Sequence, residues 1–99
     1  MDQPQATRIL TIGIAEGLHM RAAMEVAKLL ANYQATVALI KGDHRVDGND
    51  VIQILTLGAE QHEQLTVEAV GAQAEEALDA LATLFESDFS KETDTEKAE

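Results

Sequence analysis

The sequence contains no cysteine and no tryptophan, and tyrosine and phenylalanine together supply only three aromatic residues among 99. Without cysteine, the chain cannot form disulfides, use a thiol in catalysis or build a cysteine-type zinc site. No apolar run approaches the roughly 20 residues that a membrane-spanning helix requires. The first residues, "MDQPQATR", also lack the apolar core of a secretory signal. We therefore expect a soluble, cytoplasmic protein.

Basic residues are scarce as well. The chain has seven lysines and arginines against eighteen aspartates and glutamates, which gives a net charge of −11. Nucleic-acid phosphates and anionic membrane surfaces repel such a chain, so neither is an expected partner. The histidines His19, His44 and His62 show no HxH or HxxxH spacing. We expect neither a metal site nor a bound cofactor, and the acidic charge itself is explained by solubility.

The remaining composition is typical of one globular domain. Hydrophobic residues make up 45% of the chain, and a chain of this length has room for one modest core. The final stretch, "SDFSKETDTEKAE", has one aromatic and otherwise mostly polar residues, too little apolar surface to offset the entropy cost of ordering it. We predict a domain over residues 1–87 and a disordered acidic tail over residues 88–99.

The hydrophobic pattern alternates between the two-residue period of strands and the 3.6-residue period of helices. Strands are predicted over Thr7–Ile14, Ala35–Lys41 and Glu63–Val70, with a short one around His44–Val46. Helices are predicted from Met20 to about Asn32, between Asn49 and Gly58, and over Ala72–Ser87. The core stripe expected on the first helix is Met20, Ala23, Ala27 and Leu30, with Val26 beside them. Because each strand has one apolar face, we expect an α+β sandwich, in which helices cover one side of an antiparallel or mixed sheet.

The stretch "EGLHMRAAMEVAKLL", Glu16–Leu30, places a histidine where the first helix begins. The first turn of a helix has unpaired amide groups and roughly half a unit of positive charge, which suits an anion such as phosphate. An imidazole offers an unprotonated, nucleophilic nitrogen at neutral pH. His19 could therefore carry a phosphoryl group, with Arg21 adding charge and Gly17 allowing a close backbone approach. The alternative is that His19 is an ordinary polar surface residue. No second acid or base lies close to it in sequence, so a hydrolase built on this histidine has no support.

The segment Gly17–Ala23, "GLHMRAA", resembles the active-site segment of HPr, the histidine phosphocarrier of the bacterial sugar phosphotransferase system. The usual pattern in that family is Gly-Leu-His-x-Arg-Pro-Ala. The segment Ile54–Ala59, "ILTLGA", resembles the second signature of the family, and the similarity runs without gaps from about Ile9 to Phe85. The resemblance implies an open-faced β-sandwich, in which three helices cover one side of a four-stranded antiparallel sheet.

The resemblance also implies roles for individual residues. His19 would accept a phosphoryl group on Nδ1 from a phosphoenolpyruvate-dependent phosphotransferase of the Enzyme I type and pass it to an acceptor of the Enzyme II type. The chain would then be a monomeric carrier rather than an enzyme with turnover of its own. The residues that hold the phosphoryl group would be Gly17, Met20 and Arg21. Partner proteins would dock on Met24, Lys28, Val51, Ile52 and Leu55.

Three departures from the family pattern bear on function. Ala22 replaces the usual proline, which makes the first helical turn less rigid without excluding phosphotransfer. Asp50 stands where many members carry a regulatory serine. It is interpreted as the N-cap of the short helix and also as a fixed charge that partly mimics a phosphoserine. Lysines are missing from the docking face, where only Lys28 remains, so electrostatic steering towards an acidic enzyme is weak.

A second hypothesis follows from these departures. The chain could be a regulatory module that acts in carbon or nitrogen control, with little phosphotransfer. It would dock to a transcriptional regulator or to an HPr kinase through the same surface, with Asp50 as its regulatory residue. The two hypotheses differ in whether function requires His19.

Overall fold

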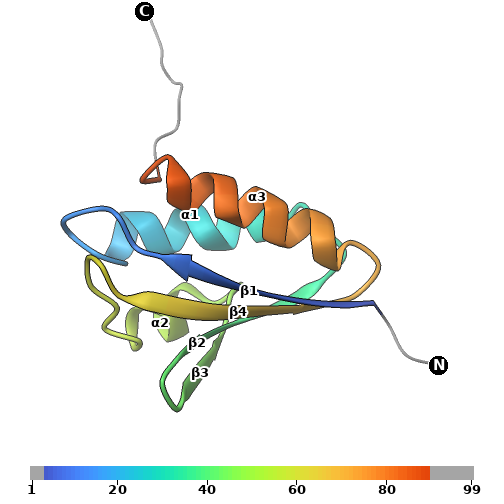
Figure 1. Ribbon diagram of the computed structural model, residues 1–99, viewed down its shortest axis with the longest axis horizontal. Coiled ribbons are helices and arrows are strands. Elements are labelled where there is room, and N and C mark those ends of the chain that lie inside the picture. Colours follow the sequence, from blue (N-terminus) through green and yellow to red (C-terminus); the bar gives the residue numbers. More distant parts are fainter. Residues whose placement is uncertain (1–3, 90–99) are drawn as a thin grey trace, which may run out of the picture.

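Four strands form one antiparallel sheet, and three helices pack against it. The computed structural model describes residues 4–89 (Figure 1). The strands are β1 (Gln5–Thr11), β2 (Thr36–Lys41), β3 (His44–Asp47) and β4 (Gln64–Val70). The helices are α1 (Met20–Leu30), α2 (Val51–Leu55) and α3 (Ala74–Glu86). The strand order is β1-β4-β2-β3 and every neighbouring pair is antiparallel, so the sheet is not mixed.

The strand register brings the buried apolar residues of all four strands to one face. Leu10 of β1 lies opposite Leu65 of β4, and Leu39 of β2 lies opposite both Val67 of β4 and Val46 of β3. All five side chains are buried. Side chains alternate between the two faces of a strand, so a shift of one residue would move every apolar side chain to the opposite face. The alternation in the sequence therefore fixes the register.

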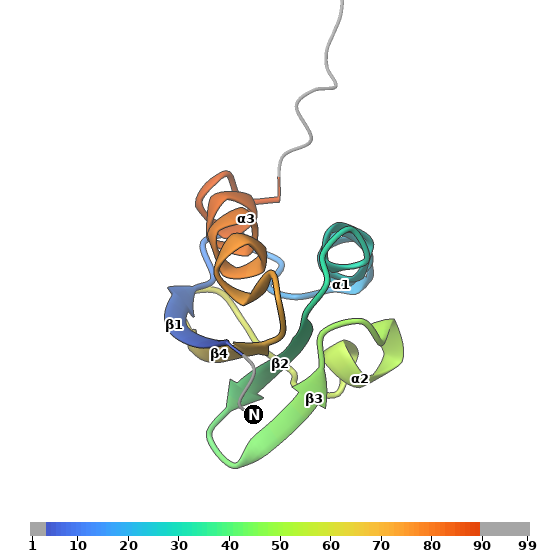
Figure 2. The same cartoon turned by 90° about the vertical axis from the view of Figure 1, so that its right-hand side faces the viewer.

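The helices cover only that apolar face. Figure 2 shows α1 and α3 side by side on one side of the sheet, and α2 packs against α1 and β3. Their buried residues include Val26 and Leu30 of α1 and Leu78 of α3. Within residues 4–89, no helix covers the opposite face, where Ile9 of β1 is 61% exposed. The predicted open-faced sandwich with three helices on one side is confirmed.

The first strand is displaced from its predicted position. Alternation predicted Thr7–Ile14, whereas β1 spans Gln5–Thr11. Ile12 and Ile14 continue the alternation and are buried, but they lie in the loop before α1. The alternation of apolar and polar residues indicates which side chains face the core. Here it continues beyond the last paired residue of the strand.

One residue of the predicted stripe on α1 does not face the core. Met20 is 51% exposed, whereas Ala22, which the prediction left out, is fully buried. At about 100° per residue, Met20 lies roughly 120° around the helix from Val26, at the margin of the apolar stripe. The prediction for Met20 was therefore wrong, and those for Ala23, Val26 and Leu30 are confirmed.

The packed part of the chain continues past residue 87, where the domain was predicted to end. Phe89 is fully buried, and its ring centroid lies 4.8 Å from that of Phe85 on α3. Asp88 and Phe89 both have positive φ angles, which reverse the chain after α3. The rest of the predicted tail, residues 90–99, lies outside the described residues.

Candidate functional site

His19 is the N-cap residue of α1. Its backbone is extended, with φ −82° and ψ −173°, and its side chain makes no capping hydrogen bond. The ring is partly buried, and Nδ1 lies 3.1 Å from the carbonyl oxygen of Gly17. Because a carbonyl only accepts hydrogen bonds, this contact places a proton on Nδ1 and leaves Nε2 with the lone pair whenever the ring is neutral. The predicted position of His19 at the helix start is confirmed.

The end of α1 beside this ring favours an anion. The first hydrogen bond of the helix runs from the amide of Ala23 to the carbonyl of His19 at 2.9 Å. The amides of Met20, Arg21 and Ala22 precede it and have no acceptor within the helix. No acidic residue lies in the first turn, so no carboxylate of that turn competes for these amides.

The loop before His19 rests on a second loop. We call residues 12–19 the histidine loop and residues 57–63 the support loop. The amide of Leu18 donates to the carbonyl of Ala59 at 2.9 Å, and Leu18 itself is buried. Gly17 has φ +72°, and a Cβ atom built on it would lie 2.5 Å from the carbonyl oxygen of Ala59. Only glycine combines this left-handed backbone with so close an approach, so Gly17 is required by the contact between the two loops.

Arg21 forms a hydrogen bond with a residue that is distant in the sequence and was not predicted to contact it. Its side chain is exposed, and Nη1 donates to the carbonyl oxygen of Phe89 at 3.1 Å. The guanidinium group has further N–H donors available for an anion. The sequence prediction missed Phe89, and the only signal that pointed to it was a single aromatic residue in an otherwise polar segment.

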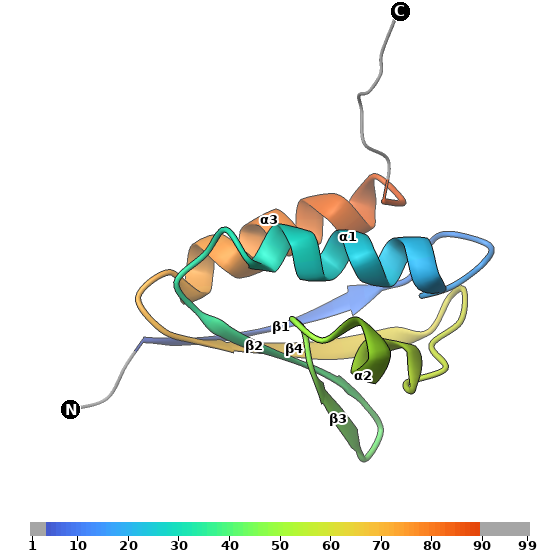
Figure 3. The same ribbon diagram turned by 180° about the vertical axis from the view of Figure 1, so that it is seen from behind.

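Exposed apolar side chains lie on α1 and α2, two helices that pack against each other (Figure 3). Met20 and Met24 lie one turn apart on α1 and are 51% and 54% exposed, and Ile52 on α2 is 68% exposed. Lys28 is exposed on α1, one turn after Met24. Val51 and Leu55, which were also predicted to face a partner, are only partly exposed and pack against the core. We call Met20, Met24, Lys28 and Ile52 the docking patch.

Asp50 caps α2, as predicted from the sequence. Its carboxylate accepts the backbone amide of Gln53 at 3.2 Å and the side-chain amide of the same residue at 3.2 Å. Its own backbone is extended, which is the usual conformation of an N-cap. The proposed regulatory effect of this charge stays a prediction.

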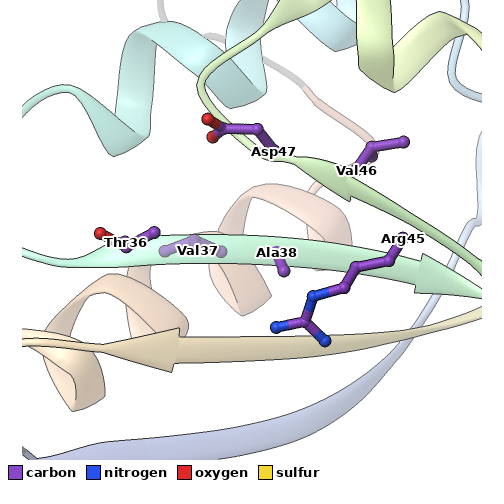
Figure 4. A pocket seen from close by; sticks show the side chains of 6 residues that line it. All are labelled: Thr36, Val37, Ala38, Arg45, Val46 and Asp47. Carbon is purple, nitrogen blue, oxygen red and sulfur yellow. The ribbon is translucent and has the colours of Figure 1, made fainter.

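Away from His19, a pocket of about 270 Å³ opens between β2 and β3 (Figure 4). It is lined by Thr36, Val37, Ala38, Arg45, Val46 and Asp47. The Arg45 side chain reaches across β2 to Glu68, with Nη1 2.8 Å from Oε1. Its one cation is paired with Glu68 and no residue of the histidine loop lines it, so this pocket lies apart from the candidate site.

Residues 4–89 contain neither a metal-binding cluster nor a membrane-spanning helix. No group of three or more histidine, aspartate or glutamate side chains there is arranged to hold a metal ion. In the same part of the chain, no helix has the length and apolar character needed to cross a membrane.

Comparison with known proteins agrees with this geometry. The family model described as "PTS HPr component phosphorylation site" matches residues 6–87. Phosphocarrier protein NPr of Escherichia coli is 38% identical over 78 residues, which cover 77% of this chain and 86% of that protein. The phosphoryl donor subunit DhaM of the PEP-dependent dihydroxyacetone kinase of Providencia stuartii is 34% identical over 73 residues, which cover 74% of this chain but 15% of that protein. The crystal structure of HPr-C-His from Thermoanaerobacter tengcongensis superimposes with a TM-score of 0.83 at 28% identity, covering 88% of this chain and 98% of that one.

Proposed function

We propose, from the fact that this chain belongs to the HPr family of phosphocarrier proteins, that His19 is the residue that carries the phosphoryl group. The observation that supports this most is the place of the ring. It lies at the N-cap of α1 without making a capping bond, beside amides that have no acceptor within the helix. An anion attached to this ring would meet the positive end of the helix.

The transfer step balances without any cofactor. A nitrogen of the His19 ring attacks the phosphorus of a phosphohistidine on an Enzyme I-type donor, and the bond between that phosphorus and the donor nitrogen breaks. The donor ring keeps the electron pair. If Nδ1 is the nucleophile, as the family resemblance implies, its proton first has to move so that the ring carries hydrogen on Nε2. The Nδ1 contact to the Gly17 carbonyl is therefore a resting contact that phosphorylation replaces.

We place the donor and the Enzyme II-type acceptor on the docking patch in turn. The patch adjoins the start of α1, and its two methionines can adapt to more than one partner surface. Since donor and acceptor would use the same patch, we propose that the chain acts as a monomer. Arg21 and the amides of the first turn, including that of Met20, are the proposed ligands of the phosphoryl group.

The experiment is phosphorylation with phosphoenolpyruvate and Enzyme I, followed by detection of an acid-labile phosphate. The wild-type chain is expected to take up about one phosphate, in line with one reactive nucleophile. The variant His19→Ala is expected to take up none, whereas His44→Ala, which alters an exposed histidine, should label normally. A label that persists in His19→Ala would exclude His19 as the acceptor.

A second candidate function is a regulatory module that binds a transcriptional regulator or an HPr kinase. The observation that favours it is Asp50, a fixed carboxylate that begins α2 directly beside the docking patch. On this hypothesis His19→Ala keeps its affinity for the regulator, while Ile52→Glu loses it. Equal affinity of wild type and Ile52→Glu for the regulator would exclude docking through this patch.

A further inference from the structure

Lys41 and Glu63 form an ion pair that holds the support loop. Lys41 ends β2 and Glu63 directly precedes β4, and Nζ of Lys41 lies 3.0 Å from Oε1 of Glu63. The same ammonium group donates to the carbonyls of Gly58 at 3.0 Å and Leu57 at 3.4 Å. Glu63 accepts the backbone amide of Glu60 through Oε1 at 2.7 Å. One pair of side chains thus fixes the backbone on both sides of residue 59.

Residue 59 is the point on which the histidine loop rests. Ala59 accepts the amide of Leu18, and its carbonyl also fills the space where a side chain of Gly17 would stand. Further hydrogen bonds join the two loops: His62 N to Ile12 O at 2.7 Å, Ile12 N to Glu63 O at 3.0 Å and Gln61 Nε2 to Gly13 O at 2.9 Å. Figures 1 and 3 show the two loops adjoining at the same end of the sheet. A movement of the support loop would therefore move the backbone that leads into His19.

We infer that Lys41 and Glu63 are positioning residues for the phosphoryl acceptor. They act through the backbone of Ala59 and Leu18, and they set where the His19 ring stands relative to the amides of α1. The inference deepens the proposed function and rests on it, because the position matters through transfer to His19. A misplacement of about 1 Å at a reacting group can cost roughly 100-fold in rate, so a partial shift is expected to cost about tenfold.

The chain contains a matched control for this pair. Arg45 and Glu68 form an ion pair of 2.8 Å between β3 and β4. Glu63 and Glu68 have equally exposed side chains, at 39% each, and Arg45 is more exposed than Lys41, at 58% against 33%. Partly exposed pairs of this kind contribute little to global stability. The two pairs differ in what else they bind, since only Lys41 and Glu63 hold the support loop.

The experiment compares Lys41→Met and Glu63→Ala with Arg45→Met and Glu68→Ala. Nuclear magnetic resonance of the unphosphorylated proteins follows the Leu18 amide and the His19 ring nitrogens, and phosphorylated Enzyme I provides the transfer kinetics. We expect the first two variants to shift both resonances and to lower kcat about tenfold, with KM unchanged because the docking patch is intact. The control variants should resemble wild type. Lys41→Arg, which keeps a cationic donor for the carbonyls of the support loop, should restore most of kcat.

Each outcome is informative. The inference is overturned if Lys41→Met and Glu63→Ala match their controls in the resonances, or if the resonances move and kcat does not. It is also overturned if KM rises while kcat stays constant. Failure of the proposed function gives a different result, in which the wild-type chain itself is not phosphorylated. Urea unfolding of all five variants shows whether a loss of kcat merely follows a loss of folded protein.

Discussion

Substitution of Gly17 by alanine tests whether the support loop fixes the backbone that leads into His19. Gly17 adopts a left-handed conformation with φ +72°, and its Cα faces the backbone of the support loop. A Cβ atom would lie 2.5 Å from the carbonyl oxygen of Ala59 and 2.9 Å from Cα of Glu60. Both are backbone atoms, so neither can move aside by rotating a side chain.

Two costs determine the expected loss of stability. An alanine in the left-handed region costs about 1–2 kcal/mol. Displacing packed backbone atoms adds about 1–3 kcal/mol, as overpacking of a core does. The lower entropy of the unfolded alanine chain returns about 0.4–1 kcal/mol. We therefore expect a net loss of about 1–5 kcal/mol, against the roughly 5–15 kcal/mol that stabilises a typical domain.

The assay is urea unfolding with Gly42→Ala as the control. Gly42 also has a left-handed backbone, with φ +59°, but nothing lies within 4 Å of a Cβ atom at that position. The control should lose only the conformational cost, about 1 kcal/mol. Gly17→Ala should in addition shift the Leu18 amide resonance and slow phosphorylation of His19. Equal stability of the two variants would refute the claim that the contact with Ala59 fixes the histidine loop.

Three other predictions concern the surroundings of the site. Phe89→Ala should lower the free energy of unfolding by about 3 kcal/mol, measured by thermal unfolding, because it removes a fully buried ring packed on Phe85. A loss no larger than that of a surface substitution would contradict this packing. Asp50→Ala should lose about 1 kcal/mol in urea unfolding, and Asp50→Ser should recover most of it, because serine also caps helices; an equal loss in both would mean that the cap is not what stabilises α2. The hydrogen bond from the Glu60 amide, and then Lys41, lower the pKa of Glu63 below its ordinary value of 4.5. The stabilisation that Glu63 supplies is therefore present above that value and lost as the pH falls through the lowered pKa. An acid titration followed by nuclear magnetic resonance should shift the Glu60 amide resonance below pH 4.5 more in wild type than in Glu63→Gln, and identical titration curves would contradict this role of Glu63.

The local periodicity of hydrophobic residues predicts the fold well because it follows which side chains are buried. The alternating residues of β4 and the stripe on α3 all face the core, and their predicted bounds lie within about two residues of those observed. The same property explains the errors. Ile14 alternates with Ile12 because both are buried, although neither belongs to β1. Met20 fits the spacing of a helical stripe and yet lies at its margin.

The candidate site was predictable where it is local and not where it is assembled by the fold. His19, Gly17 and Arg21 are close in sequence, and the position of His19 at the helix start followed from a glycine turn and a change of period. The contact between Arg21 and Phe89 joins residues 68 positions apart. The pairing of Lys41 with Glu63 depends on β2 and β4 being neighbours in the sheet. No local sequence pattern predicts such contacts, because they depend on which elements of the fold lie next to each other.

A phosphoryl carrier has to hold its cargo firmly enough to survive dissociation from the donor and weakly enough to give it up again. Among residues 4–89, the groups proposed to bind a phosphoryl group on His19 suit both needs, because they supply partial or already shared positive charge. The end of α1 supplies about half a unit of positive charge. Arg21 donates through Nη1 to the carbonyl of Phe89, so it would bind a phosphoryl group through its remaining N–H groups. A site with several unpaired cations would bind the phosphoryl group more tightly and thereby raise the barrier to the second transfer. If His19 carries the phosphoryl group, as proposed, the modest charge beside it favours passing the group on over storing it.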